Sequence, residues 1–394
     1  MTHTAHRRRR RWPWLSLAVV AVFNGGCALL PISGSRVPAV RGDAAPPAAD
    51  ANLHEYRGVI HIHTTYSDGT GTYAEIIRTA RQQRLDFLIV TDHNTLQAFD
   101  EHREGWYPPE ATASTDDGRT LVLANDEISA PDGHVVAIGV TQPVSRDQSS
   151  QAIIDAIEQQ GGLAFLAHPH YARKPWTNWS VQRYTGMEIY NFAEDAATQH
   201  KLLLVLRGMA CTPDAFYRRL IRRPTWNLAQ WDRLLSEGGR IVGIGSADAH
   251  GLRPLRLRLA PYDLLFRTIR THVLAPELSR ARLLEALRAG HAYAALDLLG
   301  DATGFVFRAE AGDGHVAAQM GDQMAWAPNL SLVIYTPTTA ELRLMRDGQL
   351  IGTRRAQQWR HRLDAPGVYR LEVFLHHRFW IASNPIYVRP PVLP

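Results

Sequence analysis

The sequence of 394 residues predicts an α/β protein, a closed or distorted β/α barrel followed by a small all-β, immunoglobulin-like sandwich. From Tyr56 onward, apolar runs such as 87–90 and 163–167 alternate with amphipathic stretches. This alternation is typical of β/α folds. Polar residues recur directly after the apolar runs, where barrel folds place their active sites. Beyond about Asp301 the pattern changes to short alternating strands, which indicates a second unit.

The first 26 residues have the three parts of an export signal. Five arginines at 7–11 precede an apolar run at 12–23 that is too short to span a bilayer as a mature helix. Asn24-Gly25-Gly26 leads into Cys27, which resembles the lipid-modified cysteine of bacterial lipoproteins, although Asn24 stands where that pattern has leucine. We expect an exported protein, periplasmic or anchored to the membrane through a lipid on Cys27. Simple cleavage and a retained anchor are the alternatives.

Residues 27–52 are rich in Pro, Ala, Gly and Ser, which indicates a flexible tether or a disordered start of the mature chain. Cys211 is the one other cysteine. A lipid on Cys27 would leave Cys211 without a partner, so no disulfide framework is expected. A bridge between the two cysteines is the alternative.

The basic character of the chain is local. Removing the five arginines of residues 1–26 from the 43 basic residues leaves 38, which equals the number of acidic residues. A formally neutral mature protein lacks the electrostatic footprint of a nucleic-acid binder. We therefore expect a small-molecule substrate and no nucleic-acid partner.

The predicted strands of residues 53–300 lead into side chains that can bind a metal. Strand 58–60 runs into His61-Ile62-His63, and residues two apart in a strand point to the same face, so the two imidazoles should project together. The whole set of nine comprises His61, His63, Asp68, His93, Glu127, His134, His168, Asp248 and His250. Imidazole nitrogens and carboxylate oxygens are the usual donors for zinc, iron or manganese. Six histidines and three acids beside strands predict one shared metal site.

These residues fall into five motifs: His-x-His-x4-Asp-Gly at 61–69, Thr-Asp-His-Asn at 91–94, Glu127 followed by Gly133-His134, Ala-His-Pro at 167–169 and Ser-Ala-Asp-Ala-His at 246–250. Together they resemble, in the family's order, the polymerase and histidinol phosphatase (PHP) superfamily. The resemblance runs from about His54 to Gly300. It implies a distorted seven-stranded β/α barrel, spanning residues 53–300, with two or three divalent ions of zinc, manganese or iron.

The resemblance also implies which residue holds which ion. His61, His63, Glu127 and Asp248 would hold one ion, and Asp68, His93 and His168 a second. Glu127 would bridge to a third, completed by His134 and His250. Some family members carry histidine where Asp68 stands. The exported start and the terminal sandwich make the layout similar to the carbaryl (carbamate) hydrolase branch.

Bound divalent ions lower the pKa of their water from about 15.7 toward about 7, which supplies hydroxide at neutral pH. Asp248 and Glu127 are the expected catalytic carboxylates, because they would bridge metals or position the hydroxide. We predict a metal-dependent hydrolase, a phosphoesterase acting on a small phosphate ester. A carbamate, ester or amide hydrolase on the same centre is the alternative, and a non-enzymatic binding lipoprotein is the third.

Residues beside the predicted ligands have two possible roles each. Asp92, Asn94 and Asp126 could orient imidazoles or could form turns. The residues that follow ligand-bearing strand ends could contact the substrate or could be solvated loop charges, and they are His170, Tyr171, Arg173, Lys174 and Arg253.

The remaining sequence predicts a helical insertion at 195–240, whose aromatic residues mostly pack, and the terminal unit at 301–394. The terminal strands are expected at 330–335, 342–345, 368–374 and 386–388. Arg346-Asp347-Gly348-Gln349 predicts a type I′ hairpin turn, because Asp-Gly suits the positive φ angles of that turn. We expect this sandwich to be a structural or docking module.

Overall fold

The computed structural model describes residues 46–47, 52–107, 119–197, 212–251 and 260–391. The predicted export signal, Cys27, most of the predicted tether, Cys211 and Arg253 lie outside these residues. Within them, no helix is both long enough and apolar enough to span a bilayer.

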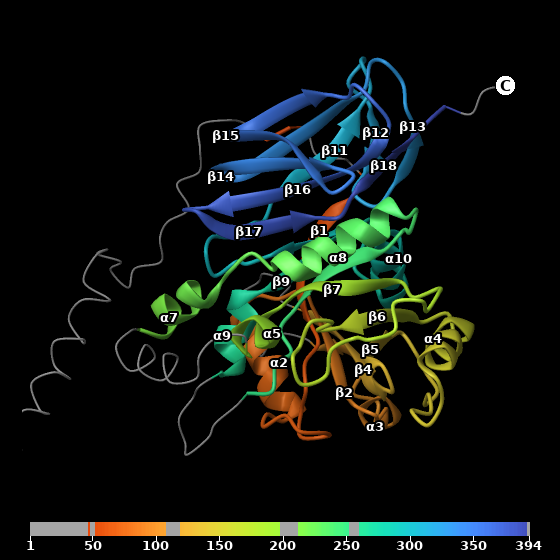
Figure 1. The fold of residues 1–394 in the computed structure, drawn as a ribbon. Helices are drawn as coiled ribbons and strands as arrows, with labels where there is room; N and C mark the ends of the chain where they lie inside the picture. Colours follow the sequence, from red (N-terminus) through yellow and green to blue (C-terminus); the bar gives the residue numbers. More distant parts are fainter. Residues whose placement is uncertain (1–45, 48–51, 108–118, 198–211, 252–259, 392–394) are drawn as a thin grey trace, which may run out of the picture.

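One large sheet carries the predicted metal-binding residues (Figure 1). Its strands are hydrogen-bonded in the order β10-β9-β1-β2-β4-β5-β6-β7-β8. Their bounds are β1 (His54–Ile60), β2 (Phe87–His93), β4 (Thr120–Ala130), β5 (Gly133–Ile138), β6 (Leu163–Ala167), β7 (Gly186–Asn191), β8 (Val242–Ser246), β9 (Arg270–Ala275) and β10 (Ala292–Ala295). The short strand β3 (Gly105–Tyr107) pairs with β4.

The sheet is mixed, whereas the alternation of strands and helices predicted parallel pairing. The pairs β1–β2, β2–β4, β6–β7 and β7–β8 are parallel, but β5 runs antiparallel to both of its neighbours. The reversal follows from the tight Pro131-Asp132 turn between β4 and β5. Gly133 ends this turn with φ +148°, and a Cβ there would lie 2.6 Å from the Trp176 ring. Only glycine fits this backbone without strain.

The two ends of the β1-to-β8 order meet through backbone contacts outside the named strands. Ile62 and Ala249 form an isolated parallel bridge, and the His63 N–H donates to the Ala249 carbonyl at 2.9 Å. The Ala249 N–H donates in turn to the carbonyl of His61 at 3.1 Å. The structure therefore shows a mixed α/β fold around a large sheet. It does not confirm the predicted closed barrel, and the described strands form no continuous closed ladder.

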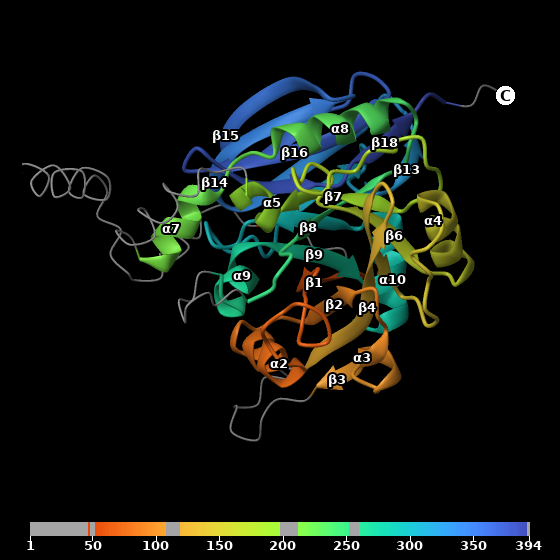
Figure 2. The ribbon, with the colours of Figure 1, turned by 60° about the horizontal axis from the view of Figure 1, so that its bottom comes forward.

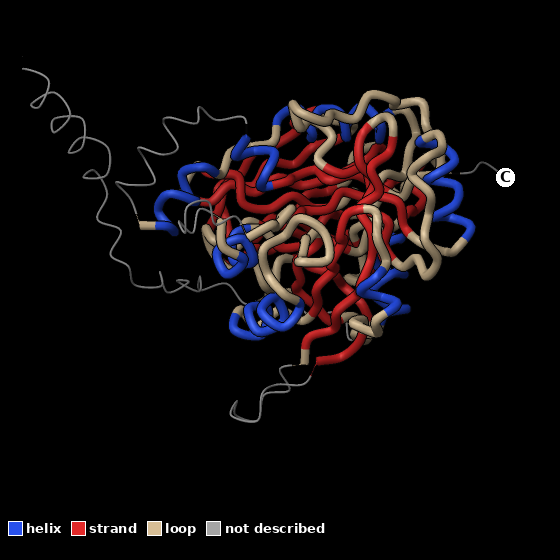
Figure 3. The backbone as a smooth tube through the Cα atoms, turned by 90° about the horizontal axis from the view of Figure 1, so that it is seen from below, coloured by secondary structure: helices blue, strands red, loops and turns tan. Residues whose placement is uncertain are grey.

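Helices cover the outside of the sheet, with strands through the middle (Figures 2 and 3). Two of the amphipathic stretches between the apolar runs form the helices α2 (Tyr73–Gln82) and α4 (Ser150–Gln159). A capping box between Thr72 and Glu75 begins α2, and the Ser149 side chain caps α4. The others are α3 (Gln97–Asp100), α5 (Phe192–Ala197), α7 (Pro213–Leu220), α8 (Thr225–Ser236), α9 (Tyr262–Thr268) and α10 (Arg280–Ala289).

The apolar strands are buried on both faces, which explains why they lack alternation. In β2, Leu88 and Val90 join one core cluster, while Phe87 and Ile89 join another on the opposite face. A third cluster lies among the C-terminal strands. The sheet is thereby a rigid support for the residues at its edge.

The C-terminal part is all β, at the top of Figure 1. It contains β11 (Val306–Glu310), β12 (Val316–Gln319), β13 (Gln323–Ala325), β14 (Ser331–Arg346), β15 (Gln349–Arg362), β16 (Gly367–Leu375), β17 (Arg378–Ser383) and β18 (Ile386–Arg389). The predicted hairpin at Asp347-Gly348 is confirmed, with φ +49° and +75°. An immunoglobulin-like arrangement is not confirmed, because β17 pairs with β10 and continues the large sheet.

A buried ion-pair network joins this part to α8. Arg370 is fully buried and binds the Asp232 carboxylate of α8 through two hydrogen bonds of 2.6 Å. It also donates to Glu372 at 2.8 Å, and Glu372 accepts two bonds of 2.7 Å from Arg223. Because each charge is paired, the network fixes how the C-terminal strands lie against the helix.

Candidate metal centre

The carboxylate of Glu127 lies at the centre of the predicted ligands. Glu127 belongs to β4 and is fully buried. Its Oε1 faces His134 Nδ1 at 2.8 Å and His168 Nε2 at 3.0 Å. Its Oε2 faces three more ring nitrogens: His61 Nε2 at 2.9 Å, His63 Nε2 at 3.2 Å and His93 Nδ1 at 3.2 Å. Five histidines from four segments of the chain therefore converge on one carboxylate.

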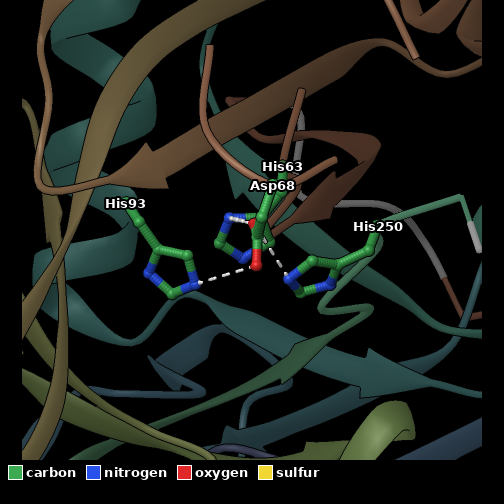
Figure 4. A group of neighbouring side chains, drawn as sticks. All are labelled: His63, Asp68, His93 and His250. Carbon is green, nitrogen blue, oxygen red and sulfur yellow. Dashed lines mark ion pairs between the residues drawn. The ribbon is translucent and has the colours of Figure 1, made fainter. Parts of the chain in front are cut away.

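Two further carboxylates complete the group. Asp68 reaches the rings of His63, His93 and His250 at 3.8, 3.8 and 3.3 Å (Figure 4). Asp248 Oδ1 lies 3.6 Å from His61 Nε2, 3.4 Å from His63 Nε2 and 3.3 Å from His250 Nδ1. All nine predicted residues thus lie in one connected cluster.

The backbone brings these side chains together differently from the prediction. β1 ends at Ile60, so His61 and His63 do not belong to a strand, and His61 has φ +69°. The left-handed turn of the backbone at His61 and the bridge at Ile62 aim both rings at Glu127. His134 is the second residue of β5, and the reversal of β5 is the reason it reaches the edge where the parallel strands end. It lies opposite Ala167 in the ladder, next to His168.

Three sets of donor atoms are close enough to hold a metal ion. One joins His61, His63 and Glu127; another joins His93, Glu127 and His134; the third joins His63, Asp68, His93 and His250. Glu127 takes part in two of the sets, as a bridging carboxylate would. The second and third sets differ from the groupings that the resemblance implies. The assignment of each ligand to an individual ion therefore stays a prediction.

Several buried donor atoms of the cluster lack a hydrogen-bond partner among the described residues. They are His61 Nε2, both ring nitrogens of His63, His93 Nδ1, His168 Nδ1 and Glu127 Oε2. A buried polar atom without a partner costs about 1–3 kcal/mol, so native proteins rarely leave several together. Most of these atoms face one another across a small space. Divalent cations bound there would satisfy them, so the donor set fits the predicted metals.

The electrostatics of the cluster also favour bound cations. Burial alone would raise the pKa of Glu127, but the neighbouring histidines, His61 above all, hold that pKa well below its usual range. Burial likewise opposes the charged form of His63, yet the nearby carboxylates of Asp248 and Glu127 raise its pKa to about 9. The His250 ring lowers the pKa of Asp68 to about 2. The site therefore favours anionic carboxylates and a compensating positive charge, which bound cations could supply in place of protons.

The three candidate orienting residues tie loops together instead of contacting imidazoles. Asp92 accepts hydrogen bonds from the Thr64 N–H and hydroxyl at 2.7 Å each and from the Ser67 hydroxyl at 2.6 Å. These bonds fix the loop between His63 and Asp68. Asn94 makes two hydrogen bonds with Ser129. Asp126 accepts from the Thr95 N–H at 3.3 Å.

The sequence analysis missed Glu188. Its carboxylate lies 2.6 Å from His61 Nδ1 and accepts the His168 N–H at 2.6 Å. The available signal was an acid inside the apolar run of β7, since a buried glutamate is rare unless it is paired.

The candidate substrate contacts lie in the loop after His168. His170 and Arg173 are exposed, and Tyr171 and Lys174 are half-buried. The His170 ring stacks on Trp226, with centroids 4.5 Å apart, and the Tyr171 ring meets the His168 ring edge-on at 5.4 Å. Arg253 lies outside the described residues. Contact of these side chains with a substrate stays a prediction.

Comparisons with known proteins give distant similarities. No protein-family profile matches the chain. Uncharacterized protein MJ1587 of Methanocaldococcus jannaschii is 25% identical over 123 residues, which are 28% of this chain and 66% of that protein's length.

Several solved structures resemble the chain, among them the following two. A two-domain protein containing a predicted PHP-like metal-dependent phosphoesterase from Bacteroides vulgatus has a TM-score of 0.43 and 17% identity, covering 88% of this chain and 98% of its own. An amidohydrolase from Chromobacterium violaceum has a TM-score of 0.29 and 13% identity, covering 49% of this chain and 87% of its own. The PHP-like family that the motifs resemble is thus named among the similar structures. The carbaryl hydrolase branch stays a prediction, and we argue the function from the side chains of the site.

Proposed function

We propose that this chain is a metal-dependent hydrolase of the PHP type that acts on a small phosphate ester. The observation that carries the proposal is the convergence of five histidines on the buried Glu127 carboxylate, within a connected cluster of nine residues that offer nitrogen and oxygen donors. We also infer that the large sheet is the family's distorted seven-stranded barrel, and that the C-terminal strands are an immunoglobulin-like sandwich.

The ligand sets implied by the resemblance are part of this proposal. His61, His63, Glu127 and Asp248 would hold one divalent ion, Asp68, His93 and His168 a second, and Glu127 with His134 and His250 a third. The position of Glu127 supports the bridging role, because its two oxygens face different histidines. Zinc, manganese and iron all suit this mixture of imidazole and carboxylate donors.

The accessibility of the ligands indicates where a substrate would enter. The side chains of His61, His63 and Glu127 are fully buried. In contrast, His93, His134 and His250 are 23%, 18% and 21% exposed, and Asp68 is 57% exposed. A phosphate ester would therefore approach from the Asp68 side, with the buried residues forming the floor of the site.

The proposed chemistry divides between the bound metal ions and the carboxylates of the site. When bound, the divalent ions supply a water of lowered pKa and polarise the scissile phosphoryl group. Glu127 and Asp248 provide the fixed negative charge that retains the cations. Asp248 Oδ1, which lies near His61, His63 and His250, would accept a hydrogen bond from the attacking water and orient it. The buried floor excludes bulk water, which strengthens these interactions.

A parallel assay tests the proposed function. Purified full-length protein would be analysed for bound metal, and then assayed with p-nitrophenyl phosphate and with an aryl carbamate before and after metal removal. Metal-dependent release of p-nitrophenol from the phosphate is the expected result. Turnover of the carbamate alone would replace the phosphoesterase with a carbamate hydrolase on the same centre. Protein without stoichiometric metal and without activity would instead favour a binding lipoprotein.

We further propose the arrangement of the chain around this centre. An export signal at 1–26 and a tether at 27–52 would place the metallohydrolase domain (53–300) and the terminal domain (301–394) in the periplasm or at a membrane surface, with Cys27 as the lipid-bearing residue. Mass spectrometry of the mature N-terminal peptide tests this, because a lipid on Cys27 adds a defined mass. An unmodified terminus at another residue would contradict the lipid anchor.

A further inference from the structure

Glu188 holds two of the predicted ligands with one carboxylate. Its Oε1 lies 2.6 Å from Nδ1 of His61, and its Oε2 accepts the backbone N–H of His168 at 2.6 Å. Glu188 itself is fully buried in β7. Charge-assisted hydrogen bonds of this length are among the stronger polar contacts in proteins.

The two residues that Glu188 holds both have left-handed backbone. His61 has φ +69° and His168 has φ +28°. Residues other than glycine adopt such angles at a cost in free energy, and they persist where the surroundings impose them. Glu188 contacts the side chain of one and the backbone of the other, so it opposes relaxation at both places.

The Glu188 carboxylate is itself locked by a chain of hydrogen bonds. Asn191 Nδ2 donates to Glu188 Oε2 at 2.7 Å, and Asn191 Oδ1 accepts the Glu194 N–H at 2.9 Å. Asn227 Nδ2, in the first turn of α8, donates to Glu194 Oε2 at 3.2 Å. Each of these residues is buried. The carboxylate therefore has little freedom to rotate away from His61 and His168.

We propose that Glu188 is a positioning residue for the metal centre, which sets His61 and the His168 loop in their ligating arrangement. With Nδ1–H of His61 donated to Glu188, Nε2 is the nitrogen left to bind a metal, and it faces Glu127 Oε2 at 2.9 Å. The backbone bond to His168 fixes the second ligand relative to the first. The inference rests on the proposed function for its metal, and it names the residue on which the geometry of that metal site depends.

A merely structural glutamate would stabilise the fold without affecting metal affinity, so the test needs a matched control. Asp297 provides one. It is a buried carboxylate that also binds a histidine, His272, at 3.3 Å, together with Arg270 at 3.1 Å and the Ala302 N–H at 3.2 Å. None of these partners belongs to the nine-residue cluster. Asp297→Asn therefore repeats the chemical change of Glu188→Gln at a distant buried site.

The affinity of full-length protein for Mn²⁺ and Zn²⁺ would be measured by calorimetric titration for wild type, Glu188→Gln and Asp297→Asn. A glutamine has one acceptor oxygen, so it cannot accept from both His61 and His168. We expect roughly 10- to 100-fold weaker metal binding in Glu188→Gln, as for other partners of metal-bound histidines. Asp297→Asn should bind metal as wild type does. Equal affinities in all three proteins, or equal losses in the two variants, would overturn the positioning role.

A second measurement works without metal. Amide hydrogen exchange in the metal-free proteins should be faster at His168 in Glu188→Gln, and unchanged there in Asp297→Asn. If Glu188→Gln does not fold, Asn191→Ala keeps the carboxylate but removes one of its restraints, and a smaller loss of metal affinity is expected. Wild-type protein that binds no metal would refute the proposed function, while the exchange data would still show whether Glu188 holds the loop. Unaltered exchange at His168 in Glu188→Gln would refute the proposal that Glu188 restrains the His168 backbone.

Discussion

The side chain of Asn384 makes two hydrogen bonds with the backbone of Gly243. The Gly243 N–H donates to Asn384 Oδ1 at 2.8 Å, and Asn384 Nδ2 donates to the Gly243 carbonyl at 2.9 Å. Asn384 Nδ2 also reaches the Ala292 carbonyl at 2.8 Å. A side chain that follows β17 thus completes the pairing of β8, the strand that leads to Asp248.

Replacing Asn384 with alanine should therefore destabilise the protein. The change leaves the backbone groups of Gly243 and the Ala292 carbonyl without these bonds, and we expect a loss of about 2–4 kcal/mol in the free energy of unfolding. Urea denaturation of wild type and variant measures it. Leu350→Ala, at a side chain that is 53% exposed on β15, is the control and should change little. Wild-type stability in Asn384→Ala would show that water replaces the lost bonds.

Removing a predicted ligand should abolish turnover and leave the fold intact. Loss of a partner of a metal-bound histidine typically reduces affinity or activity 10- to 100-fold, so His61→Ala or Asp248→Ala should reduce turnover more than about 100-fold. Hydrolysis of p-nitrophenyl phosphate and circular dichroism measure activity and fold. An active His61→Ala enzyme with normal metal content would contradict the proposed centre.

Chelation should lower the melting temperature as well as the activity. The folded site binds metal and the unfolded chain does not hold its ligands together, so metal at about 100 times its Kd adds about 2.7 kcal/mol of stability. Melting curves recorded in EDTA and after addition of Mn²⁺ or Zn²⁺ test this. Superimposable curves would mean that the cluster holds no cation.

The pairing of His272 predicts a loss of stability at alkaline pH. Burial lowers the pKa of this ring, but Asp297 and Glu55 raise it to about 9, above the unfolded value of about 6.5. The contribution is therefore complete below about pH 6.5 and is lost as pH rises through 9. Its size is on the order of 3 kcal/mol.

The measurement is urea denaturation of metal-loaded wild type and His272→Gln between pH 6 and 10. Loaded protein is needed because the histidines of the metal centre also titrate when it is empty. The stability difference between the two proteins should shrink as pH approaches 10. A constant difference would mean that the ring is neutral in the folded protein.

The sequence predicted which residues form the cluster better than it predicted the backbone conformation and strand directions that bring them together. Most of the nine residues stand beside an apolar run, and buried runs of this kind place their ends at a common edge. The left-handed angle at His61 could not be predicted, since only a few per cent of residues other than glycine adopt a positive φ. Pro131-Asp132-Gly133 was a readable turn signal, and it explains the reversed β5 that a purely parallel prediction missed.

Glu188 was missed for a different reason. A residue that positions two ligands forms no sequence motif of its own. The partners of Glu188 are distant in sequence, because His61 follows β1 and His168 follows β6. Only the folded sheet shows that a side chain of β7 reaches both. The closed barrel and the sandwich were predicted from strand periodicity, which does not determine which edges pair.

In the hairpin between β4 and β5, the length of the Pro131-Asp132 turn is as important for the metal centre as the identity of its ligands. Glu127 and His134 belong to the two arms of this hairpin, and Glu127 Oε1 meets His134 Nδ1 because the arms are aligned by a two-residue turn. Deleting one residue from Pro131-Asp132 would slip the alignment by one position and turn the imidazole toward the opposite surface of the sheet. Such a protein would retain every metal-binding residue in its composition and still lose the bridge between them.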